Sequence, residues 1–388
     1  MKRSLSLLTG VLTSIALVRG LASCAEGAPK AEENDAGSTP DADPGHPLQP
    51  PDGGGTGRCE AGAWCAVDLG SAPVSLNGVW GSSATDVWIA GSPDTILHWD
   101  GKDLARSKTE TRQTLFGVWG SGPGDVWAYS TGESIWHSDG FHDGGVVWST
   151  LDGGAGTDDP VFTGVVASMW GRNANDVWAV GPFSFSTGTS SVWHSNGWTE
   201  SGPSWSAINT STSDPPFPEP ISWSAIWGSG GGELWLVGAG GKTRHAKDVA
   251  GENVGSWEAV NSNTSHDLFA VWGSGTDVWA AGAGGTMRRF SRDVDGSVLV
   301  TEVVLPTTET IQSIFGFGPN DIWAAGTGAT LLHWDGGEWS VVDVPVDPPQ
   351  RSERDLYSIW GSSPDDLWVV GRNVLLHKGS ADLPGRSK

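Results

Sequence analysis

The sequence predicts an all-β protein, specifically a seven-bladed β-propeller closed by an N-terminal strand that completes the last blade. Three observations lead to this prediction. One short pattern recurs seven times along the 388 residues. Trp (24) outnumbers Phe (10) and Tyr (2), and the 57 glycines suit many short strands joined by tight turns. The last copy also lacks a segment that is found near the N-terminus, as closure of a ring requires.

An aromatic-glycine pair aligns the seven copies, with the aromatic residue at positions 80, 119, 170, 227, 272, 315 and 360. The spacings bracket the roughly 40–50 residues of a four-stranded propeller blade. Each copy divides into strand-length pieces such as "LNGVWG", "DVWIAG" and "TILHWDG", and several copies continue with a Trp-containing piece. We expect blade cores near 76–101, 115–140, 167–198, 223–257, 268–300, 311–343, and 356–380 plus 62–70.

The second piece of each copy is apolar almost throughout, which suits a sheet that is covered on both faces. Seven such sheets in a closed ring cover one another and leave only short edges. We therefore expect the repeated tryptophans to pack between blades. The segment "GAWCAVDLG" at 62–70 is similar to "GEWSVVDVP" at 337–345, so Trp64 should take the place in blade 7 that Trp339 takes in blade 6.

The N-terminus reads as an export signal over residues 1–23. Two basic residues precede a short apolar stretch, and "LASC" at 21–24 resembles a bacterial lipobox. That resemblance implies acylation of Cys24 and an outer-membrane lipoprotein, facing the periplasm or the cell surface, with ordinary secretion as the alternative. Residues 24–57 are acidic and rich in Pro and Gly, so we expect a tether without a packed core. The propeller should span 58–380, and 381–388 form a tail.

Two further cysteines lie close together, at Cys59 and Cys65. An exported protein meets an oxidising compartment, so we expect a short-loop disulfide between them, with two free thiols as the alternative.

The formal net charge of −23 sets aside nucleic acid and anionic membrane faces as partners. The membrane would be reached through the lipid anchor alone. The remaining partner classes are an envelope protein or a glycan, bound by a monomer.

The sixth copy, "GTGATLLHWDGGEW", resembles the Asp-box (BNR-type) repeat, in which an Asp-containing hairpin joins strands three and four. The whole unit is similar to the photosystem assembly-factor-like propellers and to bacterial repeat lipoproteins. This resemblance implies a structural role for the Asp-box-like residues Asp100, Asp139, Asn196 and Asp335, and no activity by itself. Copies four and five depart from the pattern, as "GGKTRHAKD" and "GGTMRRFSRD".

Histidine recurs in register in six copies, and an acid opens the second piece of all seven. Residues in register around a seven-fold ring are too far apart to share a metal ion, so we expect no metal site. The histidines should form hydrogen bonds beside the Asp-box hairpins, and the acids should bond nearby backbone as turn formers. No cofactor is expected. Calcium at Asp152, Asp158 and Asp159 is disfavoured because their spacing does not match a calcium loop.

Function is expected where the repeat varies. Insertions at 152–164, 182–190 and 199–222 fall between strands two and three or between blades, which places them on one face of the ring. The aromatic residues there, Phe183, Phe185, Trp205 and Phe217, either touch a ligand or cap the blades. The sequence favours a non-enzymatic binding or scaffold module of the cell envelope. A lectin is the first alternative. A sialidase-like hydrolase, using Tyr129 or Tyr357, is the second.

Overall fold

The computed structural model describes residues 62–69, 74–107, 113–130, 135–142, 145–151, 165–183, 191–212, 219–346 and 348–379. The chain divides into two compact units, Met1–Asp43 and Pro44–Lys388, and every described residue belongs to the second. The predicted signal peptide, the tether with Cys24, the tail and Cys59 lie outside the described residues. So do Asp152, Asp158, Asp159, Phe185 and Phe217.

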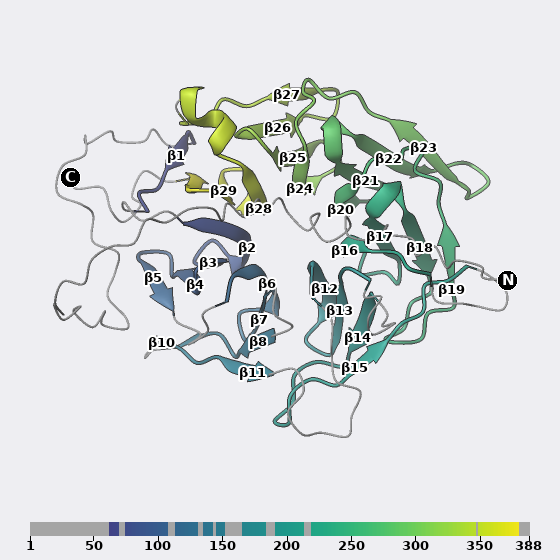
Figure 1. Ribbon diagram of the computed structural model, residues 1–388, viewed down its shortest axis with the longest axis horizontal. Coiled ribbons are helices and arrows are strands. Elements are labelled where there is room, and N and C mark those ends of the chain that lie inside the picture. The colour runs from purple at the N-terminus through teal and green to yellow at the C-terminus, as the bar shows by residue number, and fades with distance from the viewer. Residues whose placement is uncertain are drawn as a thin grey trace, which may run out of the picture. The chain divides into compact units, whose positions relative to one another are not determined.

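Seven four-stranded antiparallel sheets follow one another around a ring, which confirms the predicted fold class (Figure 1). We number them as blades in chain order. Blade 1 contains β2 (Ser75–Ser83), β3 (Asp86–Ser92), β4 (Thr95–Trp99) and β5 (Leu104–Ser107). Blade 2 contains β6 (Leu115–Gly122), β7 (Asp125–Ser130), β8 (Ile135–Ser138) and β11 (Ser149–Leu151), with a small added hairpin of β9 (Phe141–His142) and β10 (Gly145–Val146). Blade 3 contains β12 (Ser168–Asn173), β13 (Asp176–Val180), β14 (Val192–Ser195) and β15 (Trp205–Ala207).

The later blades repeat the same order from the axis outward. Blade 4 contains β16 (Trp223–Gly228), β17 (Leu234–Gly238), β18 (Thr243–Lys247) and β19 (Ser256–Ala259). Blade 5 contains β20 (Leu268–Ser274), β21 (Asp277–Gly282), β22 (Met287–Arg292) and β23 (Val298–Glu302). Blade 6 contains β24 (Ile311–Gly318), β25 (Asp321–Gly326), β26 (Thr330–Trp334) and β27 (Trp339–Val341). Blade 7 contains β28 (Leu356–Ser363), β29 (Asp366–Gly371), β30 (Val374–Lys378) and the N-terminal β1 (Trp64–Ala66).

The ring closes through β1, as the sequence predicts. β1 pairs with β30 as the outer strand of blade 7, with Trp64 opposite Lys378. In blade 6 the corresponding pair is Trp339 opposite Trp334. Trp64 therefore holds the equivalent position and packs edge-on against Trp323 of blade 6, with ring centroids 5.7 Å apart. Cys65, the buried residue that follows, is disulfide-bonded.

The aromatic-glycine pair of each repeat is explained by packing between blades. The glycine of one blade lies against the first-strand tryptophan of the preceding blade, and a Cβ on Gly120 would come within 2.5 Å of the Trp80 ring. The same close approach, at 2.4–2.7 Å, joins Gly81 to Trp360, Gly171 to Trp119, Gly228 to Trp170, Gly273 to Trp227 and Gly316 to Trp272. The second-strand tryptophans, such as Trp88 and Trp178, are fully buried. The core thus consists of a series of inter-blade layers.

This packing predicts that Gly120→Ala lowers the free energy of unfolding by about 1–3 kcal/mol, because the added methyl group overpacks a filled layer. Gly122→Ala, on the same strand, is the matched control, because a Cβ there meets no atom within 4 Å. Urea denaturation followed by tryptophan fluorescence measures both variants. Equal stability of the two variants would contradict the packing role of the glycine.

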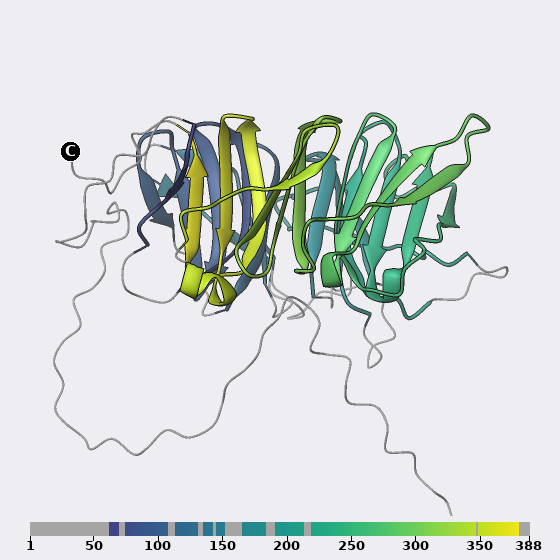
Figure 2. The ribbon, with the colours of Figure 1, turned by 90° about the horizontal axis from the view of Figure 1, so that it is seen from above.

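The two faces of the ring differ in their connections. The hairpin face carries the turns between first and second strands and between third and fourth strands. The connector face carries the links between second and third strands and between blades. Among the described residues, the 3-10 helices η1 (Ala239–Gly241), η2 (Ala283–Gly285) and η3 (Pro348–Glu353) all lie on the connector face (Figure 2).

Candidate functional site

Five of the histidines in register each form a hydrogen bond with an aspartate of their own blade. In blade 3, His194 Nε2 lies 2.8 Å from Asp176 Oδ1, and the Trp178 indole N–H donates to the same oxygen at 3.1 Å. The same His–Asp pair, at 2.7–2.9 Å, recurs as His98–Asp86, His137–Asp125, His333–Asp321 and His377–Asp366. Within the described residues no group of three His, Cys, Asp or Glu side chains could hold a metal ion.

The prediction that the repeated acids bond nearby backbone is therefore wrong for these blades. Side chains alternate across a strand, so Asp176 and Trp178 share one face of β13, and His194 lies opposite Trp178 on β14. The carboxylate is thus placed to accept from both residues. We name this unit the His–Asp–Trp cluster. Its role is structural, because its three members are buried in an inter-blade layer.

The cluster also sets the charge state of its carboxylate. Burial raises the pKa of Asp176, but hydrogen bonds from His194 and Arg172 outweigh it and lower the pKa to about 2. Asp86 and Asp125 show the same balance, with burial opposed by hydrogen bonds from His98 and His137, and the pKa of each is lowered. These carboxylates are therefore ionised at neutral pH.

Blades 4 and 5 depart from this cluster, as their sequences do. Glu233 replaces the usual aspartate, and its Oε1 lies 3.7 Å from His245 Nε2. Arg292 reaches across from blade 5 to Glu233 at 2.6 Å and to His245 Nε2 at 3.2 Å. Burial, together with the charges of Arg292 and Lys247, lowers the pKa of His245 to about 3, so its ring is neutral and accepts from Arg292.

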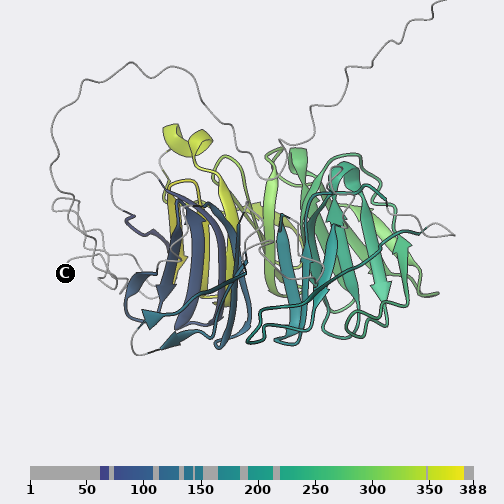
Figure 3. The same ribbon diagram turned by 60° about the horizontal axis from the view of Figure 1, so that its bottom comes forward.

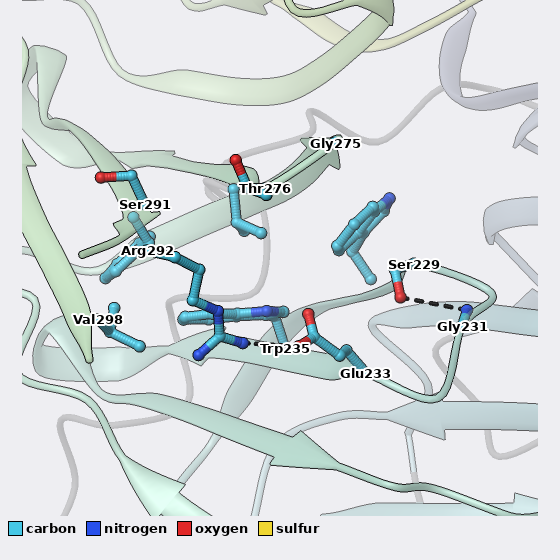
Figure 4. A pocket seen from close by; sticks show the side chains of 12 residues that line it. Ser229, Gly231, Glu233, Trp235, Gly275, Thr276, Ser291, Arg292 and Val298 are labelled. Carbon is cyan, nitrogen blue, oxygen red and sulfur yellow. Dashed lines mark hydrogen bonds and ion pairs between the residues drawn. The ribbon is translucent and has the colours of Figure 1, made fainter. Parts of the chain in front are cut away.

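A pocket of about 280 Å³ opens beside this substituted cluster, between blades 4 and 5 on the hairpin face (Figure 4). Trp235, Glu233 and Arg292 lie along one side, and Gly275 and Thr276 belong to the first turn of blade 5. Because Arg292 and Glu233 neutralise each other there, the pocket presents no free charge of either sign.

The third strand of blade 5, β22, reads "MRRFSR", and its alternation explains why both flanks of this blade are unusual. Arg288 and Arg292 face blade 4, where the Arg288 guanidinium donates to the Ser262 and Asn263 carbonyls. Arg289 faces the other way. It pairs with Asp277 at 2.5 Å and lies over the Trp279 ring at 5.4 Å.

On that second flank a groove of about 590 Å³ runs between blades 5 and 6. We name it the blade 5–6 groove. Three tryptophans form its aromatic wall, with ring centroids 5.3–5.9 Å apart, namely Trp279, Trp334 and Trp339. Opposite them runs the end of the outer strand of blade 5 and the segment that follows it, residues 301–306.

The outer strand β23 presents an unpaired edge beside this groove. β23 is the last strand in its sheet and, at five residues, is longer than the outer strand of any other described blade. The Val303 N–H donates inward to the Met287 carbonyl. Because inward and outward backbone groups alternate in an antiparallel pair, Val300, Glu302 and Val304 direct their N–H and C=O groups outward.

Exposed apolar side chains also lie along the outer strands of blades 5 and 6. Leu299 on β23 is 53% exposed, Val304 is 86% exposed, and Val341 on β27 of blade 6 is 58% exposed. In Figure 1, β23 forms the outer border of its blade, and β26 and β27 belong to the next blade around the ring. A free strand edge, an aromatic groove and exposed apolar side chains therefore occur together.

The predicted ligand-face residues do not form such a site among the described residues. Trp205 is a correction, because it is 5% exposed and lies in β15, the outer strand of blade 3, where it packs against Trp127. The sequence does not reveal β15, because three residues within a Ser- and Pro-rich segment are too few to show an alternating pattern. Phe183 is half-buried on the connector face, and its backbone N–H donates to Ser222 Oγ at 3.1 Å.

The Asp-box-like positions lie in the hairpins between third and fourth strands. Asp100 Oδ1 accepts from the backbone N–H groups of Lys102 and Asp103, and Asp335 Oδ1 accepts from those of Gly337 and Glu338. Asp139 and Asn196 occupy the corresponding turns and are exposed.

The two tyrosines considered for hydrolysis lie apart. Tyr129 is buried in β7, and Tyr357 in β28 accepts a hydrogen bond from Arg372 at 3.2 Å.

The sequence did not predict the blade 5–6 groove, although two features of it distinguish blade 5. One is the basic third strand. The other is an outer strand that carries valine where blades 3, 4 and 6 carry tryptophan.

Two solved structures resemble this chain over most of their length. One, described as YCF48 bound to D1 peptide, matches with a TM-score of 0.60 and 19% identity over 82% of this chain and 97% of its own. The other, YCF48 from Cyanidioschyzon merolae, matches with a TM-score of 0.61 and 18% identity over 81% and 98%. They confirm the predicted likeness to the photosystem assembly-factor-like propellers at the level of the fold. No protein-family model and no curated protein matches the chain.

Proposed function

We propose that this propeller is a non-enzymatic binding scaffold that holds an extended segment of a partner protein along β23, in the blade 5–6 groove. The unpaired edge of β23 carries the proposal, because its outward N–H and C=O groups can pair with an added strand while the groove takes alternate side chains. The likeness to a propeller that is described with a bound peptide supports the same class of function.

Backbone pairing gives this proposal a sharp test. Glu302→Pro removes one outward N–H from β23, and an edge strand tolerates proline where the N–H faces solvent. Ala259→Pro is the matched control, because Ala259 lies opposite Arg244 in blade 4 as Glu302 lies opposite Arg288 in blade 5. Peptides are selected from a random display library on the full chain, and their affinities for both variants are measured.

We expect the selected peptides to lose binding to the Glu302→Pro variant and to retain it on the Ala259→Pro variant, while circular dichroism shows both variants folded. Peptides that bind both variants equally would refute the proposal that the partner segment pairs along the edge of β23. A glycan array on the same protein tests the lectin alternative. Glycan binding that is lost when Trp334 is replaced by alanine, with no peptide selected, would replace the scaffold by a lectin.

We further propose that Cys24 anchors the scaffold to the bacterial cell envelope through lipid. The support is the lipobox-like sequence at 21–24 and the acidic tether that follows it. Among the described residues no helix is long and apolar enough to cross a membrane. Growth with an alkyne fatty acid should label the chain in a bacterial host and should leave a Cys24→Ser variant unlabelled. Label on that variant would contradict the assignment.

A further inference from the structure

Resting on the proposed function, we infer that the segment held along β23 is basic, with Lys or Arg side chains set against Glu302, Glu338 and the aromatic wall. The inference starts from the charges around the blade 5–6 groove. Glu302 has 72% of its side chain exposed and forms an ion pair with Arg288, which lies opposite it, at 3.8 Å, and Glu338 is also exposed. Both residues line the groove.

The positive charge of the groove is already matched. Arg289 lies in it but forms an ion pair with Asp277 at 2.5 Å, and Asp277 has 16% of its side chain exposed. Asp335, in the adjoining turn, uses its Oδ1 on the Gly337 and Glu338 N–H groups and adds a further negative charge. The open rim is therefore acidic, in a chain whose formal net charge is −23. An acidic segment would meet repulsion both locally and at long range.

Strand geometry places the partner's charges. In an added strand, the residue opposite Glu302 lies within a few ångströms of it, and opposite charges in such cross-strand pairs are favourable. The neighbouring residues of the segment point to the other side of the sheet, toward Trp334 and Glu338.

The protein itself shows that this wall accepts a cation. The Arg289 guanidinium lies over Trp279 with a carboxylate beside it. Trp334 is half-buried and lines the same groove as the exposed Glu338. It repeats the combination of an indole face and a carboxylate, which suits an ammonium or guanidinium group.

The experiment uses three fluorescent peptides of one length, in which pairs of valines alternate with pairs of lysines, of glutamines or of glutamates, so that the varied side chains lie on both sides of the bound strand. Fluorescence anisotropy gives their affinities for the full chain at low and high salt. We expect the lysine peptide to bind most tightly and to weaken as salt rises, the glutamine peptide to bind more weakly, and the glutamate peptide to bind least.

Two charge variants test whether Glu302 and Glu338 cause the preference for the lysine peptide. Glu302→Gln combined with Glu338→Gln should weaken the lysine peptide about five- to tenfold at low salt and leave the glutamine peptide unchanged. Glu258→Gln, on the outer strand of blade 4 with 59% of its side chain exposed, is the control and should change neither. Equal weakening in the control would mean that the acidic chain attracts lysine non-specifically, and would overturn the inference.

The remaining outcomes separate the inference from the function that it extends. Equal affinity for the lysine and glutamine peptides, with both lost in the Glu302→Pro variant, would keep the strand-pairing function and overturn the basic preference. Tighter binding of the glutamate peptide would overturn it as well. Failure of all three peptides to bind at any salt concentration would overturn the proposed function itself.

Discussion

Asp176→Ala is expected to lower the free energy of unfolding by about 3–5 kcal/mol, because it removes the shared acceptor of a buried charged network. The variant leaves the His194 ring, the Trp178 indole N–H and the Arg172 guanidinium without their carboxylate. Only 8% of the Asp176 side chain and 1% of the His194 side chain are exposed, so water cannot take over these hydrogen bonds. Urea denaturation followed by tryptophan fluorescence measures the loss.

The same cluster in blade 6 supplies a graded control. Asp321 accepts from His333 and Trp323 with the same geometry, but 27% of the Asp321 side chain and 28% of the His333 side chain are exposed. Water can replace the lost acceptor there, so Asp321→Ala should cost about 1–2 kcal/mol. Equal losses in the two blades would show that burial does not set how much each cluster stabilises the fold.

These clusters mark the boundary of what the sequence could predict. The fold, the number of blades and the closing strand follow from patterns that repeat seven times, because each copy must pack against the next in the same way. The pairing of Trp64 with Lys378 could be predicted because blade 6 provides an internal template. The role of the repeated acids could not be predicted. An acidic residue that begins a strand after a turn is typical of a turn former, and its histidine partner is known only once the neighbouring strand is placed.

The candidate site was harder to predict, because it lies where two blades meet. Val300 stands opposite Phe290, at the register where Trp339 stands opposite Trp334 in the next blade, but Val300 packs toward blade 4, so the missing tryptophan does not by itself explain the groove. The blade 5–6 groove depends on how the outer edges of two blades meet, and no single repeat encodes this. Trp205 shows the converse error. Its irregular sequence context predicts a loop contact, although the outer strand of blade 3 buries it.

The second large expected effect is a loss of stability in acid. The folded-state pKa of Asp176 is about 2, below its ordinary value of 3.8, because hydrogen bonds from His194 and Arg172 outweigh the burial that raises it. A carboxylate with a depressed pKa stabilises the fold fully above its unfolded pKa, and this contribution is lost as pH falls toward the folded pKa. At about 1.4 kcal/mol per pKa unit, Asp176 alone contributes about 2 kcal/mol. Asp86 and Asp125, with their own lowered pKa values, add to it in the same direction.

The urea midpoint should therefore start to fall below about pH 6.5, because His245 is then protonated in the unfolded chain but stays neutral in the folded chain, where its pKa is about 3. The fall should become steeper between about pH 4 and pH 2, where protonation of the carboxylates in the unfolded chain adds to it. The Asp176→Ala variant isolates one cluster. It starts from lower stability at neutral pH and should lose less between pH 4 and pH 2 than the unmodified chain, by about 2 kcal/mol. Parallel curves for the two proteins would mean that Asp176 is not held ionised by its partners. Stability that rises on acidification would mean that burial, which raises the pKa of these carboxyl groups, outweighs their hydrogen bonds in the folded protein.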